Sequence, residues 1–199
     1  MPLPKPLVDL RFLISKMPGF SEKGAERFLD FWWRQDEKNR NDFSEAWNKF
    51  RTLNFCKQCF FFAEDQLCSF CQDNSRDQKK ICVVSSPFII PLIEKTNYSG
   101  LYFVLDGEIT GKNGGKQILT IRKRRDYLKN RIISEKIQEL VLATDFTSSG
   151  EATAFFIQEI AKAAPIKISR LARGFQSGDL LSYSDPITIK SAMENRTSF

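Results

Sequence analysis

Four cysteines within sixteen residues constrain this chain more than any other feature. Cys56 and Cys59 form one Cys-x-x-Cys pair, and Cys68 and Cys71 form a second pair after eight intervening residues. Each pair presents two convergent sulfurs, and a short loop can bring both pairs around one tetrahedral Zn²⁺ ion. We expect one structural Zn²⁺ here, because four thiolates fill the coordination sphere and leave no position for a reacting water.

Two other arrangements also use four clustered cysteines. Disulfides are rare in a reducing cytosol, where thiols stay free. An iron–sulfur cluster takes the same ligands, and the spacing alone does not distinguish it from zinc. We favour zinc, and we expect the fifth cysteine, Cys82, to be an inert core residue because it stands in an apolar run.

The composition excludes several classes of chemistry. The chain has no histidine, so no histidine acts as general base, triad member or metal ligand. The net charge is +6, and residues 112–136 alone carry nine Lys or Arg against two acids, which favours an anionic partner. No apolar run reaches the roughly 18 residues of a membrane span, and the first residues do not resemble a signal peptide. We therefore expect a cytoplasmic protein without a membrane partner.

The first third of the chain has helical periodicity. Apolar residues recur at three- and four-residue steps from Pro6 to Met17, and Pro18 with Gly19 ends this pattern. A second helix is predicted from about Glu22.

A third helix is predicted to begin at Asp42, since Glu45 three positions later resembles a capping box. It carries an aromatic stripe, Phe43, Trp47 and Phe50, which we interpret as core packing.

Residues 17–27 have the pattern of a helix-hairpin-helix. In that motif a tight turn directs backbone N–H groups at a DNA phosphate, and basic residues of the second helix reinforce the contact without reading sequence. Lys23 and Arg27 are four positions apart and therefore share one helix face. Ser21 stands where a glycine is usual. A DNA-binding site and an ordinary helical corner with solvated charges both account for these residues.

The rest of the chain alternates short apolar runs with helical stretches. The predicted strands are 81–84, 101–105, 140–144 and 166–171, and the predicted helices are 87–96, 117–133, 151–163 and 188–194. This alternation predicts a mostly parallel sheet covered by helices.

The sheet region invites comparison with the Toprim fold, in which an acid after the first strand and an Asp-x-Asp pair after a later one hold Mg²⁺. Here Ser85 takes the first position, and Asp145 is followed by Phe146 and Thr147 without a second acid. One carboxylate would hold Mg²⁺ weakly, so we expect a Toprim-like scaffold that is not an enzyme. Glu151 suits the start of the next helix, where either a capped helix or a functional patch explains it.

The expected fold class is therefore α+β with several modules. These are an N-terminal helix-hairpin-helix domain (1–55), a four-cysteine zinc module (56–78), a Toprim-like α/β domain with a mostly parallel sheet (79–174) and a short C-terminal segment (175–199).

These pieces in this order resemble the RecR family of recombination mediators, from about Leu7 to Arg196. The resemblance rests on the four-cysteine spacing and on the motifs LISKMPG (13–19), KGAER (23–27), DNSRD (73–77), ICVV (81–84), EKT (94–96), YSG (98–100), GEATA (150–154), ISRLARG (168–174), GDL (178–180) and YSD (183–185). Each motif alone is of moderate specificity, and their common order is strong.

The resemblance implies a homo-oligomer, a dimer or a tetrameric ring that can encircle DNA. It implies RecO and RecF as partners in loading a RecA-type recombinase on DNA. Lys23 and Arg27 match the family's DNA-contacting positions. Glu151, Asp145 and Glu94 fall where the Toprim face would meet RecO.

The chain departs from the family pattern on the Toprim face. Ser85 and Ile89 stand where the family has acids, and Pro91 should kink or shorten the following helix. The loop at 110–115 looks abbreviated. These departures affect the partner surface and leave the zinc and DNA-binding elements intact.

Two alternatives to the mediator remain at this point. A Mg²⁺-dependent Toprim nuclease or primase would use Asp145 and Glu94. A zinc-containing RNA-binding module would use the basic helix at 122–131, although a solvated helix face also explains such a run.

Overall fold

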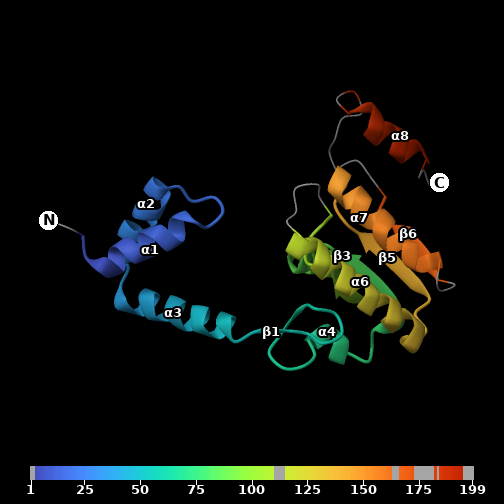
Figure 1. Cartoon of the computed structure of the whole chain (residues 1–199), viewed down its shortest axis with the longest axis horizontal. Helices are drawn as coiled ribbons and strands as arrows, with labels where there is room; N and C mark the ends of the chain where they lie inside the picture. The colour runs from blue at the N-terminus through green and yellow to red at the C-terminus, as the bar shows by residue number, and fades with distance from the viewer. Residues whose placement is uncertain (1–2, 110–114, 163–165, 173–181, 183, 195–199) are drawn as a thin grey trace. The chain divides into compact units, whose positions relative to one another are not determined.

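A computed structural model of the chain describes residues 3–109, 115–162, 166–172, 182 and 184–194 (Figure 1). The chain forms two compact units, Met1–Leu53 and Asn54–Phe199. The first is helical. The second contains the cysteine pairs and a sheet.

The first two helices form a hairpin. α1 (Lys5–Ser15) is followed by a turn in which Gly19 has a φ of +84°, a conformation that favours glycine. α2 (Glu22–Trp33) begins after Ser21, whose hydroxyl accepts a hydrogen bond from the Gly24 N–H at 3.1 Å. Buried side chains join the two helices: Ile14, Ala25 and Leu29. The predicted pair of helices and the turn between them are therefore present.

The third helix begins earlier than predicted. α3 spans Glu37–Arg51, and the carboxylate of Asp36 caps it by accepting a hydrogen bond from the Asn39 N–H at 2.7 Å. The prediction of a start at Asp42 is wrong, because Asp36 already satisfies a free N–H of the first turn. Glu45 lies inside the helix and forms an ion pair with Lys49 one turn later, at 2.6 Å.

The aromatic stripe of α3 is a surface feature of the single chain. No residue of α3 is buried, and Phe43, Trp47 and Phe50 are about half exposed. The rings contact each other, and the ring centroids of Trp32 in α2 and Phe43 lie 4.7 Å apart. The interpretation of this stripe as core packing is therefore wrong, because the rings pack along the surface of two helices.

Within the described residues, the second unit is built on a four-stranded parallel sheet in the order β4-β3-β5-β6. Its strands are β3 (Asp77–Val84), β4 (Gly100–Val104), β5 (Glu139–Ala143) and β6 (Lys167–Arg170). The other elements of this unit are β1 (Asn54–Phe55), β2 (Phe62–Ala63), α4 (Ser69–Gln72), η1 (Pro87–Ile89), α5 (Ile90–Glu94), α6 (Gly115–Glu135), α7 (Ser148–Gln158), η2 (Glu159–Lys162) and α8 (Pro186–Glu194). The predicted parallel sheet is confirmed, and the carboxyl ends of its strands meet at one edge.

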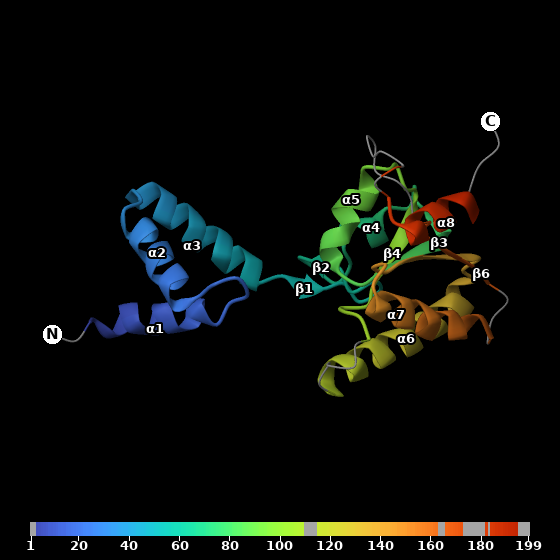
Figure 2. The same ribbon diagram turned by 90° about the horizontal axis from the view of Figure 1, so that it is seen from above.

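Helices cover both faces of the sheet, α6 and α7 on one face and α5 on the other (Figure 2). Alternate residues of β3 enter the cores on these opposite faces. Ile81 and Val83 pack on the face that α6 and α7 cover. Cys82 and Val84 pack on the other face, which α5 and the cysteine-rich module cover. Burial raises the pKa of the Cys82 thiol to about 12, so this cysteine is the inert core residue that its apolar surroundings predict.

Pro91 shapes the segment between β3 and β4. The stretch predicted as one helix over 87–96 consists of the short η1 turn and the five-residue α5. Pro91 lies in the first turn of α5, where its missing N–H costs no helical hydrogen bond. The helix is short, as expected for a segment containing this proline.

Some predictions fall outside the described residues. These are most of the loop at 110–115, the motif at 178–180, Tyr183 and, apart from the region of α8, the C-terminal segment 175–199. The division into four domains stays a prediction. None of the described helices is both long and apolar enough to cross a membrane.

Candidate functional site

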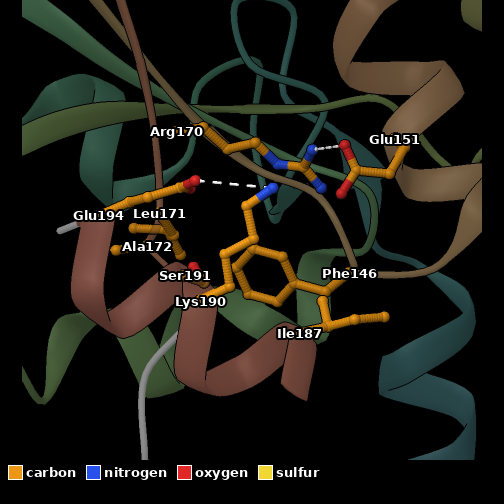
Figure 3. Close-up of a pocket in the computed structure, with 9 residues that line it drawn as sticks. All are labelled: Phe146, Glu151, Arg170, Leu171, Ala172, Ile187, Lys190, Ser191 and Glu194. Carbon is orange, nitrogen blue, oxygen red and sulfur yellow. Dashed lines mark hydrogen bonds and ion pairs between the residues drawn. The ribbon is translucent and has the colours of Figure 1, made fainter. Parts of the chain in front are cut away.

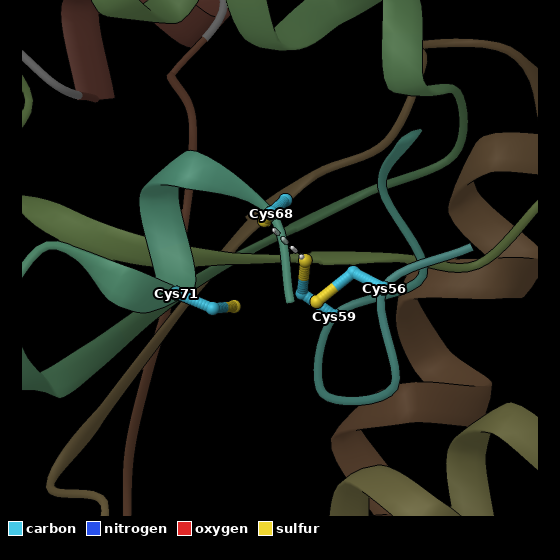
Figure 4. Close-up of side chains that lie close together, drawn as sticks. All are labelled: Cys56, Cys59, Cys68 and Cys71. Carbon is cyan, nitrogen blue, oxygen red and sulfur yellow. Dashed lines mark hydrogen bonds between the residues drawn. The ribbon is translucent and has the colours of Figure 1, made fainter. Parts of the chain in front are cut away.

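The two cysteine pairs meet at one point of the second unit. Cys56 and Cys59 lie in the turn between β1 and β2, and Cys68 and Cys71 lie at the start of α4 (Figure 4). The four sulfurs lie within 4.8 Å of one another, and the Sγ atoms of Cys59 and Cys68 are 3.4 Å apart. Cys71 is half-buried and the other three are buried. The structure thus brings the predicted ligand set together.

This arrangement fits a tetrahedral zinc ion. Zn–S bonds of about 2.3 Å separate the sulfurs of a four-cysteine site by about 3.8 Å, which is within the spread found here. Hydrogen bonds from the Cys59 thiol and from backbone N–H groups lower the pKa of Cys56 to about 5, whereas the neighbouring thiols and burial raise the pKa of Cys59. Four thiolates this close together repel one another, so a site that holds all four in the ionised form needs a cation between them. The four cysteines form a zinc site, and its closed coordination makes it structural.

Side chains of α6 support the turn between Cys56 and Cys59. The Tyr127 hydroxyl donates a hydrogen bond to the Lys57 carbonyl at 2.8 Å. The Arg131 guanidinium donates to the Gln58 carbonyl at 3.1 Å. Both residues between the paired cysteines are therefore fastened to the sheet domain.

Phe60 inserts from the cysteine turn into the core. It has a φ of +62°, and its N–H donates to the Cys56 carbonyl at 3.0 Å. Its ring meets Phe103 of β4 edge-on at 5.4 Å, and the Arg124 guanidinium lies 4.5 Å from its centroid. Arg124 and Arg131 are only 7% and 4% exposed. The basic stretch of α6 is therefore only partly available to an anionic partner.

Arg76 links the second cysteine pair to the sheet. It donates to both carboxylate oxygens of Glu94, at 3.1 and 2.5 Å, and to the Gly100 carbonyl at 2.9 Å. Its guanidinium lies over the ring of Phe70 in α4 at 4.8 Å. The Tyr102 hydroxyl donates to the same Glu94 carboxylate at 2.5 Å. Glu94, predicted to bind a partner, thus has both oxygens engaged within the fold.

The carboxyl edge of the sheet is where a Toprim metal site would form. Ser85 follows β3, is buried, and accepts a hydrogen bond from the Gly107 N–H at its carbonyl, at 2.7 Å. Asp145 follows β5 and is exposed. Among the described residues, no set of acids or cysteines other than the zinc ligands gathers closely enough to hold a metal.

Glu108 organises the loop after β5, a role that sequence reasoning missed. Its carboxylate accepts hydrogen bonds from the Asp145 N–H and the Ser149 hydroxyl, each at 2.9 Å. The Thr147 hydroxyl caps α7 by accepting from the Gly150 N–H at 3.1 Å. The helix start after Asp145 is therefore capped. No local sequence pattern predicts this role for Glu108, because the residue lies 37 positions before Asp145.

Glu151 and Asp145 are joined through Arg170 of β6. Glu151 lies in the first turn of α7 and forms an ion pair with Arg170 (Figure 3). Arg170 also donates to the Asp145 carbonyl at 3.0 Å and lies 5.2 Å from the Phe146 ring centroid. These side chains and α8 line a pocket of about 430 Å³. Two of the three predicted partner-binding residues thus lie close together.

Lys23 and Arg27 are exposed, one turn apart on α2. Neither forms an ion pair within the described part of the chain. Ser21 has a φ of −92°, so the turn needs no glycine at that position. The geometry of the hairpin is compatible with the predicted DNA contact.

A four-cysteine zinc module joined to a parallel sheet defines this chain as a zinc-containing protein of the Toprim fold. The family model of the RecR four-cysteine zinc finger domain matches residues 53–73, and that of the Toprim domain matches residues 79–172.

Curated relatives are similar over nearly the whole chain. Recombination protein RecR of Streptococcus thermophilus is 35% identical over 197 residues, 98% of each chain. Recombination protein RecR of Chloroflexus aggregans is 36% identical over 193 residues, 96% of this chain and 93% of the relative. This chain belongs to the RecR family.

Proposed function

We propose that this chain is a DNA-binding recombination mediator that works without catalytic turnover. The observation that carries the proposal is the pair of exposed cations, Lys23 and Arg27, beyond the Gly19 turn in a chain of the RecR family. Neither cation forms an ion pair with another residue that the structure describes. The closed zinc site and the ungrouped carboxylates of the described sheet edge support a role without turnover. In this role the protein helps RecO and RecF to load a RecA-type recombinase.

The proposed RecO surface is the carboxyl edge of the sheet. Asp145 is exposed there, and Glu151 lies beside it through Arg170. Glu94 has the least support as a contact, because Arg76 and Tyr102 engage its carboxylate. We further propose that the chain assembles as a dimer or a ring-shaped tetramer on DNA. Light scattering with and without DNA and RecO measures both the assembly and the partner.

The test of the DNA site is a salt titration. Lys23→Ala with Arg27→Ala should weaken binding to duplexes of different sequence alike, and should lower the slope of log K against log salt by about two. Lys38→Ala with Arg51→Ala is the matched control, since it removes the same charge from exposed positions on α3. An unchanged slope in the first variant, or an equal loss in the control, would remove the assigned site.

An activity assay on the same protein distinguishes the mediator from a Toprim enzyme. Incubation with DNA and Mg²⁺ should give no cleavage and no primer synthesis. Cleavage that Asp145→Asn abolishes would replace the mediator by a Toprim nuclease. Competition by RNA that is stronger than competition by duplex DNA would favour the RNA-binding alternative.

A further inference from the structure

We propose that Tyr127 and Arg131 of α6 are positioning residues for the zinc site. Through two peptide groups they hold the turn that presents Cys56 and Cys59 to the metal. The proposal rests on the hydrogen bonds of this turn and does not depend on the function proposed above.

The two contacts fall on the peptide groups that face a ligand sulfur. In a trans peptide the carbonyl and the N–H point in opposite directions. The carbonyl of Lys57 accepts from Tyr127, and the N–H of the same peptide belongs to Gln58, which hydrogen-bonds to the Cys56 sulfur.

The next peptide repeats this arrangement. Its carbonyl, on Gln58, accepts from Arg131, and its N–H, on Cys59, also hydrogen-bonds to the Cys56 sulfur. Each α6 side chain is therefore connected to one ligand through one peptide group.

Two physical effects follow from this connection. A donor at the carbonyl polarises the peptide, and this strengthens the N–H···S hydrogen bond at its other end. The same contacts fix the backbone of the turn before a metal arrives, so that binding orders fewer residues. Groups that orient metal ligands in this way typically change metal affinity by about 10–100-fold when removed.

The two cysteine pairs are supported differently. The pair at Cys68 and Cys71 lies on α4, where the Cys71 N–H donates to the Cys68 carbonyl at 3.1 Å. This pair is held by its own helical turn. The α6 contacts act on the other pair, so their loss should loosen half of the ligand set.

The contact of Arg131 with the cysteine turn can be separated from its contribution to helix stability. Its Nε atom pairs with Glu135 at 2.9 Å, while a different nitrogen reaches Gln58. Glu135→Gln therefore removes the ion pair and leaves the Gln58 contact in place. It is the matched control for Arg131→Met, and Arg122→Met controls for the loss of a charge from an exposed position of α6.

The experiment measures transfer of zinc from the loaded, full-length protein to a chromophoric chelator. Tyr127→Phe and Arg131→Met should each release zinc about ten times faster than the parent, and the double variant faster still. Arg131→Lys keeps a charged donor, so its zinc-release rate should lie between those of Arg131→Met and the parent. The thiolate-to-metal absorption of the cobalt-substituted protein should change in the same variants, which reports the ligand geometry itself.

Three results would overturn the proposal. One is a parental release rate in both single variants, even if their melting temperatures fall. Another is an acceleration by Glu135→Gln equal to that by Arg131→Met, since the effect would then come from helix stability. The third is an unchanged cobalt spectrum together with faster release, which would show that the turn keeps its geometry without these contacts.

Discussion

Arg76→Met should weaken the attachment of the zinc module to the sheet. The Arg76 side chain is 13% exposed and links Glu94, the Gly100 carbonyl and the Phe70 ring. Methionine is apolar and of similar length, so the variant loses the charge and its hydrogen bonds more than the packing. Glu94 would then keep its carboxylate with the Tyr102 hydroxyl as its remaining donor.

The expected loss in the free energy of unfolding is about 2–3 kcal/mol. Removing one partner of a fully buried ion pair costs about 3–5 kcal/mol, because the other charge stays buried without compensation. The Glu94 side chain is 29% exposed and regains part of its hydration, which places the loss at or below the lower end of that range.

A double-mutant cycle with Glu94→Leu isolates the pair. Removing both charges leaves no uncompensated carboxylate, so the double variant should be more stable than the sum of the single losses by about 1–3 kcal/mol. Urea unfolding of the zinc-loaded protein, followed by far-ultraviolet circular dichroism, measures each value. All three tryptophans precede residue 54, so tryptophan fluorescence separately reports the N-terminal unit.

The pH dependence of this pair has a defined sign. Burial alone would raise the pKa of Glu94, but hydrogen bonds from Arg76 and Tyr102 outweigh it and hold the pKa below the ordinary 4.5. A carboxyl whose pKa is lowered by folding contributes stability above its unfolded pKa, and this is lost as the pH falls through the folded pKa. The difference in the free energy of unfolding between the parent and Arg76→Met should therefore become smaller as the pH falls below 4.5. A coupling energy between Arg76 and Glu94 under about 0.5 kcal/mol would refute the assignment of Glu94 to the scaffold. So would a difference in the free energy of unfolding that stays the same in acid.

Two further predictions concern the sheet edge and the metal. Gly150→Ala would place a Cβ atom far inside van der Waals contact with the Asp145 carbonyl oxygen, so the start of α7 must move. We expect the free energy of unfolding to fall by more than about 2 kcal/mol in the same urea titration. An unfolding midpoint equal to that of the parent would contradict this prediction. Removing zinc with a chelator should lower the melting temperature of the second unit much more than that of the first unit, because the zinc module loses the folding energy that metal binding supplies. Circular dichroism follows the second unit, and tryptophan fluorescence follows the first. Equal shifts in both signals would argue against a local structural role.

The sequence predicted the features that depend on neighbouring residues. The cysteine spacing indicated the ligand set, and apolar runs of strand length indicated the parallel sheet. The start of α3 differs from the prediction because Asp42 with Glu45 resembles a capping box, whereas the residue that caps the helix is Asp36. The aromatic residues of α3 have the periodicity of a core helix, and periodicity alone does not say which helix face meets a core.

The features that were missed depend on distant contacts. Arg76 reaches Glu94 across 18 residues, and Glu108 reaches Asp145 across 37 residues. The sequence places Arg124 in a basic stretch and does not reveal that the Phe60 ring lies under its guanidinium. In each case one ionisable side chain meets a partner that only the folded sheet brings near.

The arginine contacts also bear on what the Toprim edge can do. A Mg²⁺ ion needs carboxylate oxygens that are free to turn toward it. Within the described residues of this edge, Glu151 is held by Arg170, while Glu108 accepts backbone and hydroxyl hydrogen bonds. Glu94 lies at the opposite edge, where Arg76 holds it beside the first residue of β4, so a divalent cation at the carboxyl edge would have Asp145 as its exposed ligand after β5. Charge-assisted bonds to arginine are among the stronger hydrogen bonds in proteins, so the ion pair of Glu151 with Arg170 supports the proposal that this edge is a scaffold without metal-dependent chemistry.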